Sequence, residues 1–444
     1  MDSGVLIVSD SPAVVKDILA RIDDDKPSLD EDASYQAVMA RCRQDAGENH
    51  VPQVRWYVDP FGYAAAVRSL LPEDENARRG RIAAALEAAG FSFIRGIGGW
   101  VDVAVDDFEL IHRTYIYAPG PREKSANVLS FPNGEDFSVP SWVPRDLATY
   151  TTGYCDILKA FDSIGPVFDE TIGEGEEGVW QDVLASLKDD PYGPQIDLRN
   201  ELIVHLGQRI TVVTSYKQPI TTKSERLLIG IEVVDEAKVE AALAKMLANE
   251  PDFYKREYKG LTIWEKVPPE PSEMEFDIGG IPGLEETPAA EETSEPLLPN
   301  AAVTVTKGHL LIASHLEHLK KILDIEEPRE TAARIPELLE VMQKIEAMDG
   351  SKSCVRFFSL TDEEYRPTFE LIRQGKMPES ETVLGRVLNV ILAPPEKGKV
   401  REQRLDGSKL PDFEVVRRHL GPAGFFGVTE DEGWFFKGFG LPKK

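Results

Sequence analysis

The sequence predicts an α+β protein made of two related copies of a mainly antiparallel sheet packed with helices, joined by a shared strand-helix-hairpin region. The first observation behind this prediction is a motif that occurs twice, as GVLIVSDSPAVVKDIL at residues 4–19 and as GHLLIASHLEHLKKIL at residues 308–323. The second is that the segments after each motif recur in one order, namely helix, strand and helix. The third is a pair of strand-like segments late in each half.

Each copy of the motif predicts a short buried strand followed by an amphipathic helix, because a run of apolar residues precedes apolar residues at helical spacing. The strands are expected at residues 4–8 and 309–313, and the helices end near Ile22 and Leu323. The elements that follow are a helix at 35–43, a strand at 54–59 and a helix at 60–71 in the first copy, and a helix at 334–345, a strand at 355–360 and a helix at 362–374 in the second.

The segments between these elements predict the rest of the chain. Asp235 is a favourable N-cap for a helix, and Lys259-Gly260 forms the turn of a hairpin. Two segments ending in His-Leu-Gly each precede a strand pair. The predicted strands are 91–95, 100–105 and 108–117, with turns at 98–99 and 106–107, then 210–216 with 226–234, 253–258 with 261–267, 302–306, and 424–428 with 433–439; further helices are predicted at 74–89, 146–161 and 179–187.

This order divides the chain into residues 1–222 and residues 223–444. The first half contains an inserted meander and loop-rich region at 91–144, and the second contains a stretch at 268–300 with nine acidic residues, seven prolines and no Lys or Arg. Such a composition predicts a solvated, disordered insertion. The strand at 4–8 has no preceding hairpin partner, unlike the strand at 309–313. We therefore hypothesise that the chain is the carboxy-terminal portion of a longer protein.

Composition excludes several classes of protein. A net charge of −27 repels the phosphates of nucleic acids, so nucleic-acid binding is not expected. The apolar runs are far shorter than the roughly 18 to 20 residues of a membrane-spanning helix. Cys42, Cys155 and Cys354 are widely spaced and form no CxxC pair, which favours buried free thiols over a disulfide framework or a zinc site.

The repeated motif, the His-Leu-Gly segments and the strand-helix-hairpin unit at Asp235 resemble exported bacterial proteins catalogued as a domain of unknown function and often labelled "membrane or secreted protein". The resemblance covers most of the chain outside residues 268–300. It implies a periplasmic or cell-surface location, and it implies no catalytic residues. The first residues, MDSGVLIVSD, lack the pattern of a secretory signal, so a cytoplasmic location stays open.

Two motifs suggest binding sites. GEGEEG at residues 173–178 matches the GxGxxG pattern, but its three glutamates would repel a pyrophosphate and no clear buried strand precedes it, so we expect an acidic turn before a helix. His309, His315 and His318 are weak candidates for zinc ligands, because the last two share a helix face. The aligned residues of the first copy, Val5, Ser11 and Val14, cannot bind zinc, so solvated or core-edge histidines are the favoured interpretation.

Two classes of function remain. The sequence contains no GxSxG, HExxH or GxxxxGK[ST] motif and implies no cofactor. We therefore favour a non-enzymatic binding or structural protein outside the cytoplasm, with an unidentified protein or cell-envelope partner. The alternative is a carboxylate-dependent hydrolase with its site in the irregular region 91–144. A deep pocket there with two or more close carboxylates would favour the hydrolase, and a flat surface would favour the binding protein.

Overall fold

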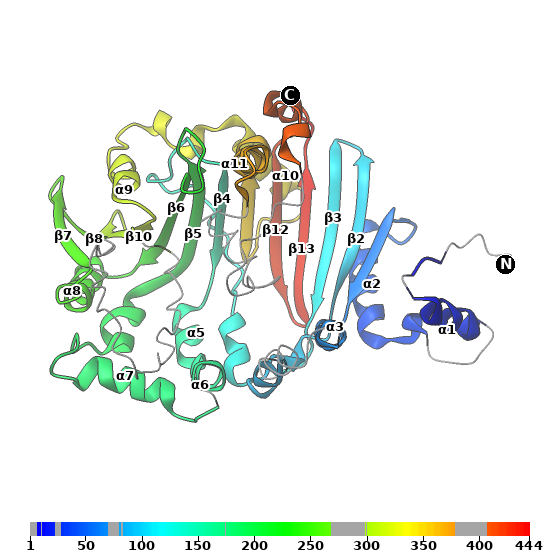
Figure 1. The fold of residues 1–444 in the computed structure, drawn as a ribbon, viewed down its shortest axis with the longest axis horizontal. Helices are drawn as coiled ribbons and strands as arrows, with labels where there is room; N and C mark the ends of the chain where they lie inside the picture. The colour runs from blue at the N-terminus through cyan, green and yellow to red at the C-terminus, as the bar shows by residue number, and fades with distance from the viewer. Residues whose placement is uncertain are drawn as a thin grey trace, which may run out of the picture.

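The computed structural model describes residues 7–9, 11–22, 28–69, 80, 83–173, 175–267, 298, 300–377 and 406–444. Its centre is one antiparallel sheet of 13 strands in the order β1-β2-β3-β13-β12-β11-β4-β5-β6-β10-β9-β8-β7, flanked by helices (Figure 1). The predicted α+β class is therefore confirmed.

The strands have 5 to 11 residues, and most of the helices run for two to four turns. The strands are β1 (Val54–Val58), β2 (Gly96–Val105), β3 (Phe108–Tyr117), β4 (Thr149–Tyr154), β5 (Leu206–Tyr216), β6 (Glu225–Val233), β7 (Phe253–Tyr258), β8 (Leu261–Lys266), β9 (Ala302–Thr306), β10 (His309–Ala313), β11 (Val355–Ser359), β12 (Ala423–Glu430) and β13 (Gly433–Gly440). The α-helices are α1 (Pro12–Ile22), α2 (Ala33–Ala46), α3 (Pro60–Arg68), α5 (Ile157–Ser163), α6 (Gly165–Thr171), α7 (Val179–Asp189), α8 (Glu236–Leu247), α9 (Leu316–Leu323), α10 (Pro336–Ala347), α11 (Thr361–Arg373) and α13 (Phe413–Arg417).

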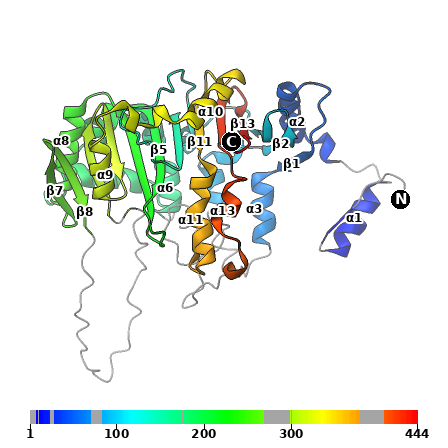
Figure 2. The same cartoon turned by 90° about the horizontal axis from the view of Figure 1, so that it is seen from above.

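Both faces of the sheet carry a hydrophobic core. Successive residues of a strand point to opposite faces, so Phe358 and Phe357 of β11 lie on different sides. On the side of Phe358, called face 1, α9 and α10 bury a large apolar cluster, and α2 covers β2 and β3. On the side of Phe357, called face 2, α8 covers β9 and β10. Figure 2 shows that α3, α11 and α13 extend from the sheet on the side opposite α2 and α10.

One order of elements occurs twice in the described chain. The series α1, α2, β1, α3 is matched by α9, α10, β11, α11, and each series is followed by a strand pair, β2-β3 or β12-β13. Each series thus contributes three neighbouring strands to the sheet, β1-β2-β3 and β11-β12-β13. These two strand triplets meet where β3 pairs with β13, which gives the mirrored order β1-β2-β3-β13-β12-β11. The interpretation of these series as related copies stays a prediction.

The boundary predicted at residue 222 falls between β5 and β6, which are neighbouring strands of the sheet. Strands from the two predicted halves also alternate, because β4 pairs with β11 and β3 pairs with β13. The two halves therefore contribute to a single sheet. In the described ranges, no helix has the length and apolar composition needed to cross a bilayer.

Three sequence-based predictions are wrong. The strand predicted at 91–95 is absent, because Phe91–Phe93 forms the 3-10 helix η2 and β2 begins only at Gly96. Residues 98–99 do not form a turn but lie inside β2, where a side chain on Gly99 would come within 2.0 Å of the backbone oxygen of Arg113. These glycines allow neighbouring backbone to approach closely. The helix predicted at 146–161 is strand β4 followed by α5, since the Thr and Tyr residues of TYTTGY favour a sheet. The turn at 106–107 is confirmed, and Asp106 has a φ of 52°.

Several other predictions fall partly or wholly outside the described residues. These are most of the strand at 4–8, half of the helix at 74–89, whose described residues 80 and 83–88 are helical, and nearly all of the insertion at 268–300. The hypothesis about the strand at 4–8 and its missing partner therefore stays a prediction.

Candidate functional site

Face 2 contains an apolar cavity of about 430 Å³. This volume is within the range of small-molecule binding sites in proteins, about 300 to 1,000 Å³. Among the described residues, the wall contains no carboxylate, lysine or arginine, and its polar side-chain groups belong to a threonine, a tyrosine, a tryptophan and two cysteines. The lining residues are Ile94, Ile97, Ile116, Leu129, Phe131, Thr151, Gly153, Tyr154, Cys155, Ile210, Val212, Cys354, Val355, Trp434 and Phe436.

Small residues on neighbouring strands lie at the floor of this cavity or directly beside it. Val355 of β11 lies between Gly153 of β4 and Gly427 of β12. A Cβ on Gly153 would lie 2.7 Å from the backbone oxygen of Cys354, and a Cβ on Gly427 would lie 2.6 Å from the Phe436 ring. Side chains larger than hydrogen are therefore excluded at both positions. The low floor leaves a hollow between the longer side chains of β5 and β13.

Aromatic side chains and the loop-rich segment close one side of the cavity. Trp434 of β13 is only 4% exposed, and its ring packs against Phe93 and Phe131 with centroids 6.1 and 6.4 Å apart. Arg122 places its guanidinium carbon 4.6 Å from the centroid of the Trp434 ring. The same guanidinium donates a hydrogen bond of 2.8 Å to the backbone oxygen of Leu129, in the 3-10 helix η3 (Lys124–Leu129).

The two thiols in the wall are not activated nucleophiles. Burial raises the pKa of both Cys155 and Cys354, and the carboxylate of Asp156 raises that of Cys155 further. A reactive cysteine needs a lowered thiol pKa. All three cysteines are free; Cys42 and Cys354 are buried, whereas Cys155, also predicted to be buried, is half-buried.

An aromatic ladder continues from the cavity across face 2. Phe425 stacks on Phe357 with ring centroids 4.9 Å apart, and its distance to Phe436 is 6.4 Å. Phe357 and Phe425 line a second, shallower hollow of about 310 Å³, which also contacts His112 and His419. Phe358, which follows Phe357 in the sequence, is fully buried on face 1. The two members of this Phe-Phe pair therefore lie on opposite faces of the sheet.

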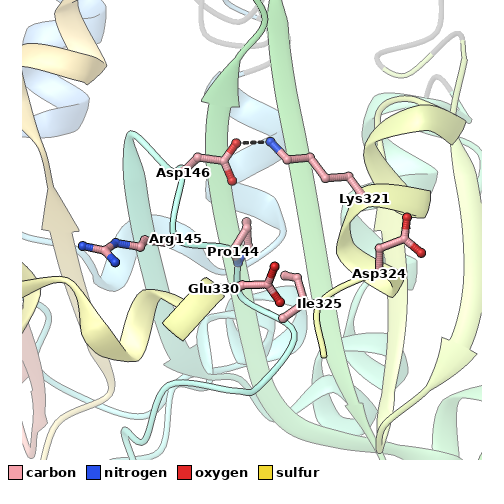
Figure 3. A pocket seen from close by; sticks show the side chains of 7 residues that line it. All are labelled: Pro144, Arg145, Asp146, Lys321, Asp324, Ile325 and Glu330. Carbon is pink, nitrogen blue, oxygen red and sulfur yellow. Dashed lines mark hydrogen bonds and ion pairs between the residues drawn. The ribbon is translucent and has the colours of Figure 1, made fainter. Parts of the chain in front are cut away.

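A charged pocket of about 540 Å³ lies at the end of α9, where Pro144 brings the loop-rich segment to the sheet. Its acidic residues are Asp146, Asp324 and Glu330. Figure 3 shows Asp146 paired with Lys321 and Arg145 pointing away from this pair. The pocket is lined by Pro144, Arg145, Asp146, Lys321, Asp324, Ile325 and Glu330.

The other two carboxylates of this pocket also have partners within the protein. Asp324 accepts a hydrogen bond of 2.9 Å from Tyr258 and lies 2.9 Å from the ammonium group of Lys259. The hydrogen bond from Lys259 holds the pKa of Asp324 below its ordinary value. Glu330 accepts from the backbone N–H of Glu327 at 3.1 Å. A general acid requires a raised pKa, so Asp324 is unsuited to that role.

The structure separates the histidines that the sequence suggests as weak zinc candidates. His309 begins β10 and packs against Trp142, whereas His315 and His318 lie beyond the far end of that strand. Each strand residue adds about 3.3 Å, so His309 is well over a metal-ligand distance from the other two. Among the described residues, no group of three or more His, Cys, Asp or Glu side chains could hold a metal ion.

The GEGEEG segment joins two helices, α6 and α7. A dinucleotide fingerprint requires a preceding strand and a helix N-terminus that is open to phosphate. Here the buried carboxylate of Asp169 accepts hydrogen bonds from the backbone N–H groups of Gly178 and Trp180, at 2.8 and 2.7 Å. The amino terminus of α7 is therefore already bound to an anion from the protein itself. This agrees with the acidic turn expected from the sequence.

No family model matches the chain, and no curated protein matches it. One solved structure, described as "Structure of crystal form III of TP0453", aligns over 70% of this chain and 82% of that chain, with 8% identity and a TM-score of 0.29.

Proposed function

We propose that this protein is a non-enzymatic binding protein whose ligand is an apolar molecule held in the face 2 cavity. The observation that carries the proposal is the wall of this cavity, which combines a suitable volume with almost entirely apolar side chains. Burial of an apolar ligand there would remove apolar surface of both partners from water, which is favourable by roughly 25 cal/mol per Å².

The alternative function is a carboxylate-dependent hydrolase with its site in the region 91–144. The charged pocket supports this alternative less than the cavity supports the binding function. Such an enzyme needs one carboxyl group as a general acid and a second as a base or nucleophile. Asp146, Asp324 and Glu330 are instead engaged with a lysine, with a tyrosine and a lysine, and with backbone N–H groups. Residues 91–144 contribute Ile94, Leu129 and other apolar side chains to the cavity, but no carboxylate.

We place this binding activity outside the cytoplasm, in the periplasm or at the cell surface, with an unidentified protein or cell-envelope partner. Support for this location comes from the resemblance of the repeated motif and its flanking segments to exported bacterial proteins. Detection of the protein in the periplasmic or surface fraction of its native cells would support the location, and confinement to the cytosolic fraction would contradict it.

The binding proposal is tested by filling the cavity. Val212 of β5 lies half-buried in its wall, so Val212→Trp would occupy volume needed by a ligand. N-phenyl-1-naphthylamine is uncharged and fluoresces more strongly in apolar surroundings. We expect it to bind the unaltered protein, and we expect Val212→Trp to weaken binding by about tenfold or more, equivalent to about 1.4 kcal/mol. Fluorescence titration measures both affinities.

Val305→Trp is a matched control, because Val305 is also half-buried in a strand but lies outside the cavity wall. Its affinity for the probe should equal that of the unaltered protein. A second readout is alkylation of Cys155, which the probe should slow because this thiol lines the cavity. Absence of probe binding, or equal binding by Val212→Trp and Val305→Trp with no protection of Cys155, would contradict the proposal.

A further inference from the structure

One half-buried cation lies beside the apolar cavity. Arg122 stacks on Trp434 and donates to the backbone oxygen of Leu129, and both of these residues line the cavity. Burial lowers the pKa of Arg122, and no carboxylate counteracts this effect. Within the described residues, Arg122 forms no ion pair. A cation that is partly removed from water without a counter-ion is unfavourable unless another group compensates for it.

Other buried or half-buried arginines of the protein show how this cost is normally met. Arg41 pairs with Glu430 at 2.7 Å, Arg113 pairs with Asp45 at 2.7 Å, and Arg209 lies 3.5 Å from Asp136. Arg226 donates to three backbone carbonyl groups, those of Lys223, Ser224 and Glu225. Arg122 donates to one, that of Leu129. Its guanidinium has five N–H donors and can bind a carboxylate through two of them.

We propose that the ligand of the cavity is a single-chain carboxylate of the fatty-acid class, with its chain in the cavity and its carboxylate paired with Arg122. This inference rests on the proposed binding function and names its ligand class. The apolar wall can contact the hydrocarbon chain, and the guanidinium of Arg122 beside Trp434 can pair with the carboxylate. The protein carries a net charge of −27, so a local cation is needed for an anionic ligand to be favoured over a neutral one.

The test compares three ligands that share one chain and differ in head charge, namely dodecanoate, dodecanol and dodecylammonium. Each is used below its aggregation concentration at pH 8 to displace N-phenyl-1-naphthylamine from the purified protein. We expect dodecanoate to bind about tenfold more tightly than dodecanol, and dodecylammonium to bind most weakly. We expect Arg122→Met to abolish the preference for the acid while leaving the affinity for the alcohol within about twofold.

Lys124→Met is the matched control, because it removes the same unit of charge two residues away. The ammonium group of Lys124 donates to the backbone oxygen of Ala88, a residue that does not line the cavity, whereas Arg122 contacts two residues that do. This variant should retain the preference for dodecanoate. Arg122→Gln provides a second substitution if Arg122→Met does not fold, as judged by circular dichroism. The comparison of the three ligands on the unaltered protein needs no variant.

The outcomes separate this inference from the proposed function. Equal displacement by dodecanoate and dodecanol from the unaltered protein would overturn the carboxylate assignment and leave apolar binding intact. Tighter binding of dodecylammonium, or a preference for the acid that survives both substitutions of Arg122, would also overturn it. Failure of the uncharged probe to bind would overturn the proposed function, and the carboxylate assignment with it.

Discussion

His318 shows how burial decides the chemistry of a single residue. It is 8% exposed on α9, and its Nε2 has no hydrogen-bond partner in the described part of the chain. Burial lowers the pKa of His318 to about 4, and the nearby Lys321, Arg226 and His315 act in the same direction, whereas Asp146 acts against them. The imidazole is therefore neutral near pH 7. Because this buried nitrogen has no hydrogen-bond partner there, His318 lowers the stability of the folded state. It is not an evident ligand for a metal.

This environment predicts a pH dependence of stability. In the unfolded chain the pKa of His318 is near 6.5, so between pH 6.5 and 4 the unfolded state binds a proton that the folded state does not. The free energy of unfolding therefore falls as the pH decreases through this window, by up to about 3 kcal/mol at pH 4. Above pH 6.5 this loss is absent, because the side chain is neutral in both states.

His318→Leu should remove both unfavourable contributions of His318, namely the buried nitrogen without a partner and the loss of stability between pH 6.5 and 4. At pH 7 we expect the free energy of unfolding to rise by about 1 kcal/mol, because a buried nitrogen without a partner is replaced by an apolar group. The gain should be larger at pH 4.5. Urea unfolding at the two pH values measures both changes. His309→Leu is the control, because it removes a histidine that has a hydrogen-bond partner. Nδ1 of His309 lies 2.8 Å from the backbone oxygen of Lys307, and the substitution removes this hydrogen bond. An unchanged pH dependence in His318→Leu would contradict the argument.

At the scale of elements, the start of α7 depends on a residue of another helix. Gly178 occupies the N-cap position and has no side chain to accept a hydrogen bond, so Asp169 of α6 supplies the acceptor through both carboxylate oxygens. This contact connects α6 to α7 and satisfies two backbone N–H groups that a helix start would otherwise leave unpaired.

Asp169→Ala should therefore lower the free energy of unfolding by about 1 to 2 kcal/mol, the usual effect of losing a helix cap. Asp182→Ala is a suitable comparison, because Asp182 lies exposed in the first turn of α7, near the positive end of the helix dipole. Its loss should change stability by less than about 1 kcal/mol. Urea unfolding distinguishes the two variants, and equal effects would show that Asp169 does not act as the cap.

The elements that the sequence predicts best are those with a strong local signal. The hairpin β9-β10 has Lys307-Gly308 at its turn, with φ values of 53° and 74°, and the helix α8 is capped by Asp235. Both are confirmed, as are α2, α10, α11 and the pairs β5-β6 and β12-β13. Strand β4 is missed because acidic and apolar residues on either side of TYTTGY mimic helical spacing.

The cavity could not be predicted by such local signals. Its wall combines residues of six strands with the loop-rich segment and the short helix η3, and these lie far apart in the sequence. Gly153 and Gly427 come to lie on either side of Val355 only because β11 pairs with β4 on one side and β12 on the other. A glycine in a strand indicates a close approach, but not which strand approaches. Arg122 likewise acquires its importance from Trp434, which lies more than 300 residues later.

At the scale of the whole molecule, the sheet joins the two predicted halves too closely for either to fold alone. A cut after residue 222 would separate β5 from β6 and β4 from β11. It would also separate β3 from β13, which connect the two mirrored strand triplets. Each fragment would then expose unpaired strand edges and half of a hydrophobic core, and such surfaces promote aggregation. The two predicted halves are therefore not expected to be independent domains.

This architecture predicts that the fragments 1–222 and 223–444 are each unfolded or aggregated, whereas the intact chain unfolds in one cooperative transition of its described sheet. Circular dichroism and amide proton spectra of the separate fragments would test the first expectation, and urea unfolding followed by tryptophan fluorescence and circular dichroism would test the second. A cut within residues 268–300 gives a comparison, because it also places paired strands on different pieces, namely β8 and β9, β6 and β10, and β3 and β13. The two pieces from that cut, produced together, should assemble, since the pairing of β8 with β9 would then connect them. A fragment 1–222 with dispersed amide signals would instead establish the first half as a domain of its own.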